Sequence, residues 1–243
     1  MKKFIFCDLH IGHEDANCDV LGKALEYVRD EAKEGDEIVG LGDWFHFDVG
    51  VQKCRDGSVT EELLRLASEI KTKLVPGNHD SDLQAKYAEL FEPIEIVAPF
   101  SENGIWYRHG HEFDFLCKYI PKSLHKLFGI IFGKKTPGVL KGEAPTFTYL
   151  MSCHTIHSKA VRNLMKEVEK GRDYRGILLG HTHLPLVQQA PELPFLINGG
   201  DMRDSLTFLV QDEDAFHLMQ WKDERWQEIS TLALVKSLGN LPS

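Results

Sequence analysis

The chain repeats one pattern, in which a short apolar, β-prone run ends in a cluster of polar residues. The runs "KKFIF", "DEIVGL", "KTKLV", "GIWY", "RGILL" and "PFLI" lead into "CDLH", "GDWF", "PGNHD", "RHGHEF", "GHTH" and "NGGD". Residues 19–33 and 60–71 lie between the first three runs and carry apolar residues at helical spacing. Alternating strands and helices predict an α/β fold. Such folds bind ligands at the carboxyl ends of their strands, where these polar clusters stand.

Residues 114–170 interrupt this alternation, and we interpret them as a helical insertion. The later part of the insertion has helical periodicity, with one apolar face predicted to hold Phe147, Leu150, Met151, His154, Ala160, Val161, Leu164 and Val168. Residues 194–229, after the insertion, read as several further strands. The sequence therefore predicts a single domain over residues 1–243 with a helical cap at about 114–170.

Composition narrows the class of protein. The net charge of −9 argues against broad nucleic-acid binding, so no stable nucleic-acid partner is expected. No apolar run in the sequence reaches the length of a membrane span. The five cysteines are scattered without a CxxC pair, which is typical of reduced thiols in a cytoplasm. We expect a cytoplasmic protein.

The polar clusters share one chemical character, because their side chains are oxygen or imidazole nitrogen donors. They hold Asp8, His10, Asp43, Asn78, His79, His109, His111, His181 and His183. Such a set suits Mn, Fe or Zn better than a thiolate site would, and it is too rich in imidazole for Ca. The five clusters that hold these nine residues supply more ligands than one metal needs. Two metals about 3.5–4 Å apart can clamp both the attacking and the leaving oxygen of a phosphoryl displacement.

The motifs "DLH", "GD", "GNHD", "HGH" and "GHTH", in this order, resemble those of the calcineurin-like metallophosphoesterases over about residues 3–185. The segment "HGHEFD", the insertion and the later "GGDMRDSLTFLV" further resemble the UDP-2,3-diacylglucosamine hydrolase-like branch. This resemblance implies an α/β fold of the four-layer αββα type, with two mixed sheets between helices. It also implies a two-metal site on loops at the strand ends.

The resemblance implies a role for each motif. Asp8, His10, Asp43 and His183 would hold one metal, and Asp43, Asn78, His109 and His181 would hold the other, with Asp43 as the bridge. A metal-bridging hydroxide would attack phosphorus. Two divalent ions are expected, with Mn as the first choice and Fe, Zn, Ni or Co as alternatives. His79 would act as general acid or phosphate donor, and Asp80 would orient its imidazole.

Other residues are predicted to contact substrate, namely His111, Arg203, Lys122 and Lys126. For Arg203 a surface salt bridge is an equal alternative. Residues 115–141 contain six lysines and no acid, interleaved with large apolar residues. This segment is either a solvated helix face packed on the core or a basic, apolar lid. A lid would meet an amphiphilic anionic substrate or the inner face of a membrane.

The sequence predicts a di-metal phosphoesterase that hydrolyses a phosphodiester or diphosphate bond of a phosphorylated small molecule or a nucleotide-linked lipid precursor. A first alternative is a phosphodiesterase or phosphatase for soluble nucleotides. A second is a non-catalytic scaffold of the same fold. Three departures from the lipid branch bear on substrate: His79 stands where arginine is frequent, His46 stands where an acidic residue is usual, and "GDM" followed by Arg203 stands where "GDW" is usual. None of these departures alters the metal ligands.

Overall fold

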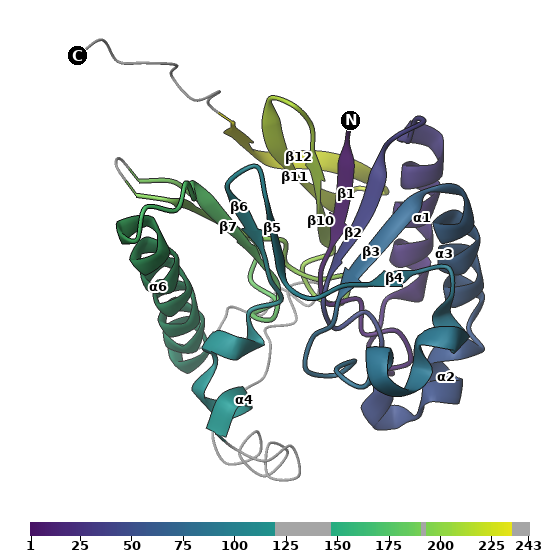
Figure 1. Cartoon of the computed structure of the whole chain (residues 1–243). Helices are drawn as coiled ribbons and strands as arrows, with labels where there is room; N and C mark the ends of the chain where they lie inside the picture. The colour runs from purple at the N-terminus through teal and green to yellow at the C-terminus, as the bar shows by residue number, and fades with distance from the viewer. Residues whose placement is uncertain (120–146, 191–192, 235–243) are drawn as a thin grey trace.

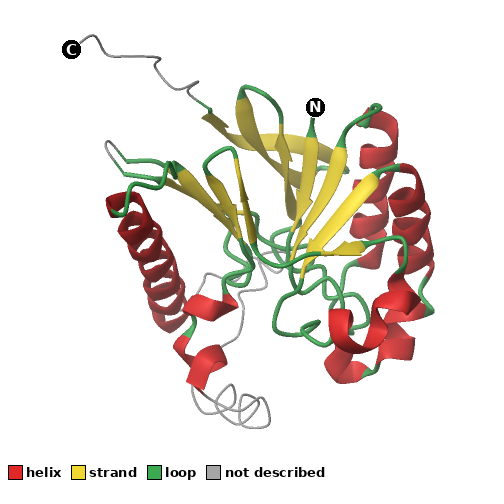
Figure 2. Cartoon of the chain, viewed as in Figure 1, coloured by secondary structure: helices red, strands yellow, loops and turns green. Residues whose placement is uncertain are grey.

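The computed structural model describes residues 1–119, 147–190 and 193–234 as two β-sheets with helices on their outer faces (Figure 1). One sheet has seven strands in the order β12-β11-β10-β1-β2-β3-β4, and the other has five in the order β5-β6-β7-β9-β8. Figure 2 shows the two sheets lying between helices, as an αββα sandwich requires. The predicted fold is confirmed.

The larger sheet combines a parallel half and an antiparallel half. Its parallel strands are β1 (Lys3–Phe6), β2 (Glu37–Leu41), β3 (Lys71–Val75) and β4 (Glu95–Ile96). Its antiparallel strands are β10 (Thr207–Gln211), β11 (Ala215–Lys222) and β12 (Arg225–Ala233). The parallel strands are joined by α1 (Cys18–Glu31), between β1 and β2, and by α2 (Val51–Arg55) and α3 (Ser58–Glu69), between β2 and β3. These helices and strands match the alternation that the sequence predicts.

Strand β1 shows how the sequence builds two cores from one sheet. Phe4 and Phe6 pack in the cluster that also holds Leu25 of α1 and Leu63 of α3. Ile5 lies in a second cluster, which fills the space between the two sheets. Side chains alternate along a strand, so consecutive apolar residues reach opposite faces of the sheet. A run that is apolar throughout therefore identifies a strand buried on both faces.

The smaller sheet is built by β5 (Phe100–Glu102), β6 (Ile105–Tyr107), β7 (Gly176–Leu179), β8 (Leu186–Gln188) and β9 (Phe195–Asn198). Strands β6, β7 and β9 are parallel neighbours, and the long helix α6 (Phe147–Glu169) lies along their outer side (Figure 1). Short helical turns fill the connections, namely η1 (Phe47–Val49), η2 (Leu83–Tyr87), η3 (Ala88–Phe91), η4 (His111–Phe113) and α4 (Phe115–Tyr119).

The predicted apolar face of α6 is wrong in part. Leu150, Met151 and Val168 are 39%, 46% and 39% exposed. Ala160 and Leu164 of the predicted face are buried, and the other buried residues of the helix are Tyr149, Cys153, Ile156 and His157. Apolar residues occupy two sides of this helix, and periodicity alone does not show which side meets the sheet. Packing against β6, β7 and β9 decides it.

The predicted insertion corresponds to the connection between β6 and β7. The described parts of this connection hold η4, α4 and α6. Residues 120–146, with Lys122, Lys126 and most of the lysine-rich segment, lie outside the described residues. Among the helices that the structure describes, none is both long enough and apolar enough to cross a membrane.

Candidate metal centre

The five motifs meet at one end of the sandwich. Each follows the carboxyl end of a strand, and the strands involved are β1, β2, β3, β6 and β7. Parallel strands of both sheets therefore deliver their motifs to a common edge. Two clusters result, one of Asp8, His10 and His183 and one of Asp43, His109 and His181, each with ligand atoms within 4.8 Å of one another. The Asn78 Oδ1 atom lies 3.2 Å from His109 Nε2. The structure thus brings the predicted ligands together.

The two carboxylates are held in the same manner. Asp8 Oδ2 accepts a hydrogen bond from the backbone N–H of His181 at 2.7 Å, while Oδ1 lies 3.5 Å from His183 Nε2. Asp43 Oδ1 accepts from the backbone N–H of His79 at 2.8 Å, while Oδ2 lies 3.3 Å from His109 Nε2. One oxygen of each carboxylate is therefore fixed by backbone, and the other faces imidazole nitrogens.

The imidazoles are also oriented through one ring nitrogen. His109 Nδ1 donates to the carbonyl of Leu41 at 2.7 Å, and His183 Nδ1 donates to Asp201 Oδ2 at 2.5 Å. His181 is held from the opposite nitrogen, because its Nε2 lies 3.2 Å from Asp114 Oδ2. A hydrogen bond at one ring nitrogen leaves the lone pair of the other for a metal. The tautomers are thus set for coordination.

Several features of the site fit two cations. Asp8 Oδ1 is buried and has no hydrogen-bond partner among the described residues. Burial raises the pKa of Asp8 to about 7. Burial alone would lower the pKa of His109, but the charges of Asp43 and Asp8 raise it to about 10. The buried carboxylates therefore require positive charge nearby, and divalent ions with oxygen and nitrogen ligands would supply it.

The backbone of the site is strained. Asp8, His10, Asp43, His181 and His183 have φ of 50°, 49°, 53°, 66° and 55°, in the left-handed region that non-glycine residues rarely adopt. Such conformations cost about 1–3 kcal/mol each and persist where the surrounding structure enforces them. Five of the seven proposed ligands share this feature, so the fold stores strain where ligand direction matters.

His79 lies at the mouth of the cluster, with its ring centre 5.2 Å from that of His10 and its side chain 29% exposed. Its Nδ1 is hydrogen-bonded to Asp48 Oδ2 at 2.7 Å. Burial works against a charged His79 ring, but this bond and the charges of Asp43 and Asp48 raise the pKa of His79 above its usual value. A raised pKa favours the protonated ring that a general acid needs.

The predicted pairing of Asp80 with His79 is wrong. Asp80 is fully buried and accepts from the backbone N–H groups of Gly77 at 2.5 Å and Trp44 at 2.8 Å. Its carboxylate therefore ties the loop after β3 to the loop after β2. Asp48, on η1, is the carboxylate that orients the His79 imidazole.

The sequence indicated no role for Asp48, Asp114 or Asp201, and it marked His46 only as a departure from the lipid branch. Two of them stand within polar clusters noted in the sequence, because Asp114 closes "HGHEFD" and Asp201 closes "NGGD". The rule that ligand imidazoles need a partner at their second nitrogen is the signal that could have identified these two acids. No sequence signal marked Asp48, whose contact depends on the path of the loop after β2.

The predicted substrate contacts have mixed outcomes. His111 lies beside the second cluster, with its ring centre 5.3 Å from that of His109, and its role stays a prediction. Arg203 forms an ion pair with Asp15 at 2.6 Å, which is the surface salt bridge that the sequence left as the alternative. Lys122 and Lys126 lie outside the described residues.

Three solved structures of low sequence identity are similar to the chain. A dimetal phosphatase from Danio rerio aligns with 96% of this chain and 98% of its own, at 12% identity and a TM-score of 0.50. A nuclease, MPE, from Pseudomonas putida aligns with 93% of this chain and 87% of its own, at 15% identity and a TM-score of 0.46. Wild-type Vps29 from Entamoeba histolytica, complexed with zinc, aligns with 96% of this chain and 99% of its own, at 11% identity and a TM-score of 0.48.

No curated protein matches the chain. Residues 1–185, which contain all five motifs and both ligand clusters, match the calcineurin-like phosphoesterase family. The strand-end ligands and the two-sheet fold agree with that match, and the chain belongs to the calcineurin-like phosphoesterase family.

Proposed function

We propose that the chain is a di-metal phosphoesterase that hydrolyses a phosphodiester or diphosphate bond. The observation that carries this proposal is the pair of adjoining ligand clusters, with buried carboxylate oxygens aimed at imidazole nitrogens. Asp8, His10, Asp43 and His183 would hold one ion, and Asp43, Asn78, His109 and His181 the other. When bound, such ions lower the pKa of water and neutralise charge on a phosphate.

His79 is proposed to donate a proton to the leaving oxygen. Asp48 holds its Nδ1, so the exchangeable proton resides on Nε2. The exposed position of the ring at the mouth of the cluster suits contact with substrate. Asp48 would also stabilise the imidazolium between turnovers, as a carboxylate partner does for other catalytic histidines.

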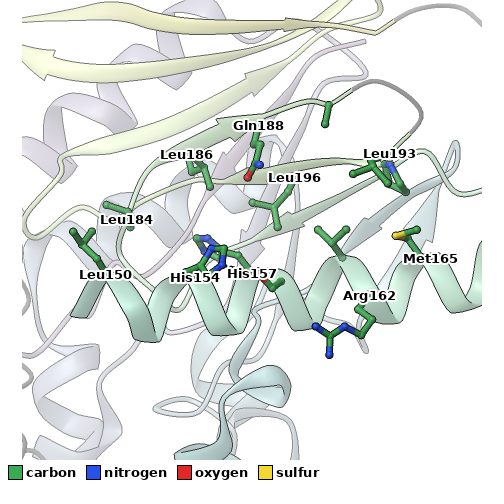
Figure 3. Close-up of a pocket in the computed structure, with 14 residues that line it drawn as sticks. Leu150, His154, His157, Arg162, Met165, Leu184, Leu186, Gln188, Leu193 and Leu196 are labelled. Carbon is green, nitrogen blue, oxygen red and sulfur yellow. Dashed lines mark hydrogen bonds between the residues drawn. The ribbon is translucent and has the colours of Figure 1, made fainter. Parts of the chain in front are cut away.

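An apolar groove supports a lipid-linked substrate over a soluble nucleotide. The groove has a volume of about 440 Å³ and lies between α6 and the strands β8 and β9 (Figure 3). Leu150, Leu186, Leu193 and Leu196 are among its lining residues. His157 also lines it and bonds to Thr182 Oγ1 at 3.0 Å, and Thr182 stands between two proposed ligands. An acyl chain in the groove would therefore lie beside the loop that carries the metal ligands.

The test is a substrate panel with Mn-loaded enzyme. The panel spans bis-p-nitrophenyl phosphate, cyclic nucleotides, phosphomonoesters and UDP-linked lipids. We expect metal-dependent turnover of diesters or diphosphates, with the lowest KM for the acylated substrate. Preference for soluble nucleotides would support the first alternative. A fully loaded protein without turnover on any substrate would support a non-catalytic member of the family.

Replacing Leu193 by serine tests the groove separately. The side chain is 45% exposed at the rim, so folding should tolerate the change. The KM for an acylated substrate should rise, while hydrolysis of a small diester should be unchanged. Manganese as the native metal, a cytoplasmic location and contact of residues 115–141 with the inner membrane face stay predictions.

A further inference from the structure

A row of imidazole rings runs from the first ligand cluster to His79. The His46 ring centre lies 5.2 Å from that of His10 and 4.2 Å from that of His79, and the His46 and His79 rings stack at an interplanar angle of 21°. The ring of His13 also contacts His46, with the two ring centres 4.6 Å apart. The His46 side chain is 13% exposed. It therefore occupies a packed position between a proposed metal ligand and the proposed proton donor.

The backbone fixes the position of His46. Its N–H donates to the carbonyl of Ile11 at 3.0 Å, and the Ile11 N–H donates to the carbonyl of Trp44 at 2.9 Å. These bonds join the segment after β2 to the segment after His10. The His46 ring is thus carried beside His10 by a short bridge between two motif loops.

The contact between the rings determines where their protons lie. His10 Nδ1 and His46 Nδ1 are 3.0 Å apart, so only one of the two nitrogens can carry the shared proton. His10 Nε2 faces the cluster, 3.3 Å from His183 Nε2. If Nε2 is to offer its lone pair to a metal, Nδ1 of His10 must donate. His46 Nδ1 must then accept, and the proton of His46 belongs on its Nε2.

That arrangement points the second nitrogen of His46 towards Asp48. His46 Nε2 lies 3.9 Å from Asp48 Oδ2, the same oxygen that accepts from His79 Nδ1 at 2.7 Å. The His46 N–H and the His79 N–H therefore face the same carboxylate oxygen, with His79 within hydrogen-bond distance and His46 beyond it. The electrostatic attraction of the His46 N–H would hold this half-exposed acid in place for His79.

His10 differs from the other proposed ligand imidazoles in its partner, because an imidazole and not an oxygen faces its second ring nitrogen in the described part of the chain. His109 is held by a carbonyl, and His181 and His183 are held by carboxylates. A carbonyl oxygen and an ionised carboxylate can only accept a hydrogen bond, so the imidazole nitrogen that faces them must donate. An imidazole can donate or accept, and its direction has to be set by a further group. Asp48 is placed to set it.

We propose that His46 is a positioning residue with two separable effects. Through its Nδ1 it fixes the tautomer with which His10 binds the first metal, and through its Nε2 it steadies Asp48 for His79. The proposal rests on the metal assignment and on the role of His79 given under the proposed function.

Amide side chains separate the two effects. In His46→Asn the amide oxygen stands near the position of Nδ1, so the acceptor for His10 is kept and the contact with Asp48 is lost. In His46→Gln the amide nitrogen stands near the position of Nε2, so the donor for Asp48 is kept and the acceptor is lost. His46→Phe keeps an aromatic ring against His79 and loses both polar contacts.

The first readout is Mn²⁺ binding, measured by titration calorimetry on metal-stripped protein. His46→Gln and His46→Phe should bind one of two Mn²⁺ ions about 10–100-fold more weakly, which is the usual loss when the partner of a ligand imidazole is removed. His46→Asn should bind both ions as the native chain does. The melting temperature of each stripped variant checks that the chain folds.

The second readout is the dependence of turnover on the leaving group. His46→Asn should lose more turnover with alkyl esters than with p-nitrophenyl esters, whereas His46→Gln at saturating Mn²⁺ should keep the native ratio. Equal Mn²⁺ affinity in Asn and Gln variants, or equal turnover ratios, would reduce His46 to a packing residue and overturn the proposal. If native chain binds two Mn²⁺ without turnover, the proposed function fails, while the Mn²⁺ titration still decides the effect on His10.

Discussion

Asp43 is the residue that we propose to bridge the two ligand clusters. It supplies a carboxylate to His109 and receives the backbone N–H of His79. Asp43→Asn should release both metal ions and abolish turnover, because the shared negative charge attracts two cations at once. Elemental analysis and a diester assay check this outcome. Asp30→Asn, on the exposed side of α1, is the matched control and should change neither. Two bound ions with normal turnover in the Asp43 variant would refute the bridge.

We propose that His79 acts on the substrate and not on the metals. His79→Ala should retain both ions and lose about 10²–10⁴-fold in turnover with alkyl esters, as expected for a missing general acid. The loss should be smaller with p-nitrophenyl esters, because that leaving group departs without protonation. Asp48→Asn should show the same leaving-group dependence with a smaller loss, since the ring remains. An equal loss for both ester types would exclude the proton-donor role.

The sequence predicted the ligands but not the residues that orient them. A ligand stands next to its strand, so a motif identifies it directly. The contacts of Asp48 with His79 and of His46 with His10 join residues 31 and 36 positions apart. Such contacts depend on loop paths that no local pattern encodes. The sequence also did not show that the Asp80 side chain turns towards the backbone of Gly77 and away from His79, because neighbouring turn residues can point in different directions.

At the scale of elements, the loop after β3 passes close to the loop after β2. A methyl group on Gly77 would collide with the carboxylate of Asp43 and lie 2.6 Å from its backbone nitrogen. Gly77→Ala should therefore displace Asp43 and weaken binding of both ions, measured by Mn²⁺ titration. Gly22→Ala is the control, because nothing lies within 4 Å of its added methyl. It should leave Mn²⁺ binding unchanged and stabilise α1 by about 0.5–1 kcal/mol. Unchanged binding in the Gly77 variant would show that the loops adjust.

The elements themselves were predicted well where one pattern dominates. β1, β2 and β3 are apolar runs with Gly, Asp or Pro at their ends, and α1 and α3 carry one apolar stripe each. The long helix α6 was placed correctly in the chain, but its buried face was predicted only in part, since apolar residues lie on two of its sides. Tertiary packing selected Ile156, Ala160 and Leu164 for the sheet. Periodicity shows that a helix is amphipathic, and the neighbour decides which stripe is buried.

At the scale of the whole molecule, the metals should contribute to stability. The clusters join loops from both sheets, and their buried carboxylates are costly without positive charge. Removal of metal by EDTA should lower the melting temperature, and excess Mn²⁺ should restore it. An ion at 100 times its Kd adds about 2.7 kcal/mol to the free energy of unfolding. Differential scanning calorimetry measures the change. Mg²⁺ at the same concentration is the control for ionic strength, and an unchanged melting temperature would show that the loops hold without metal.

We propose that the two sheets present one two-metal site, and a crystal structure with Mn²⁺ tests this most directly through anomalous scattering. Two manganese peaks are expected about 3.5–4 Å apart. One peak should lie among Asp8, His10 and His183, the other among Asn78, His109 and His181, with Asp43 between them. A single peak, or two peaks that do not share Asp43, would contradict the claim.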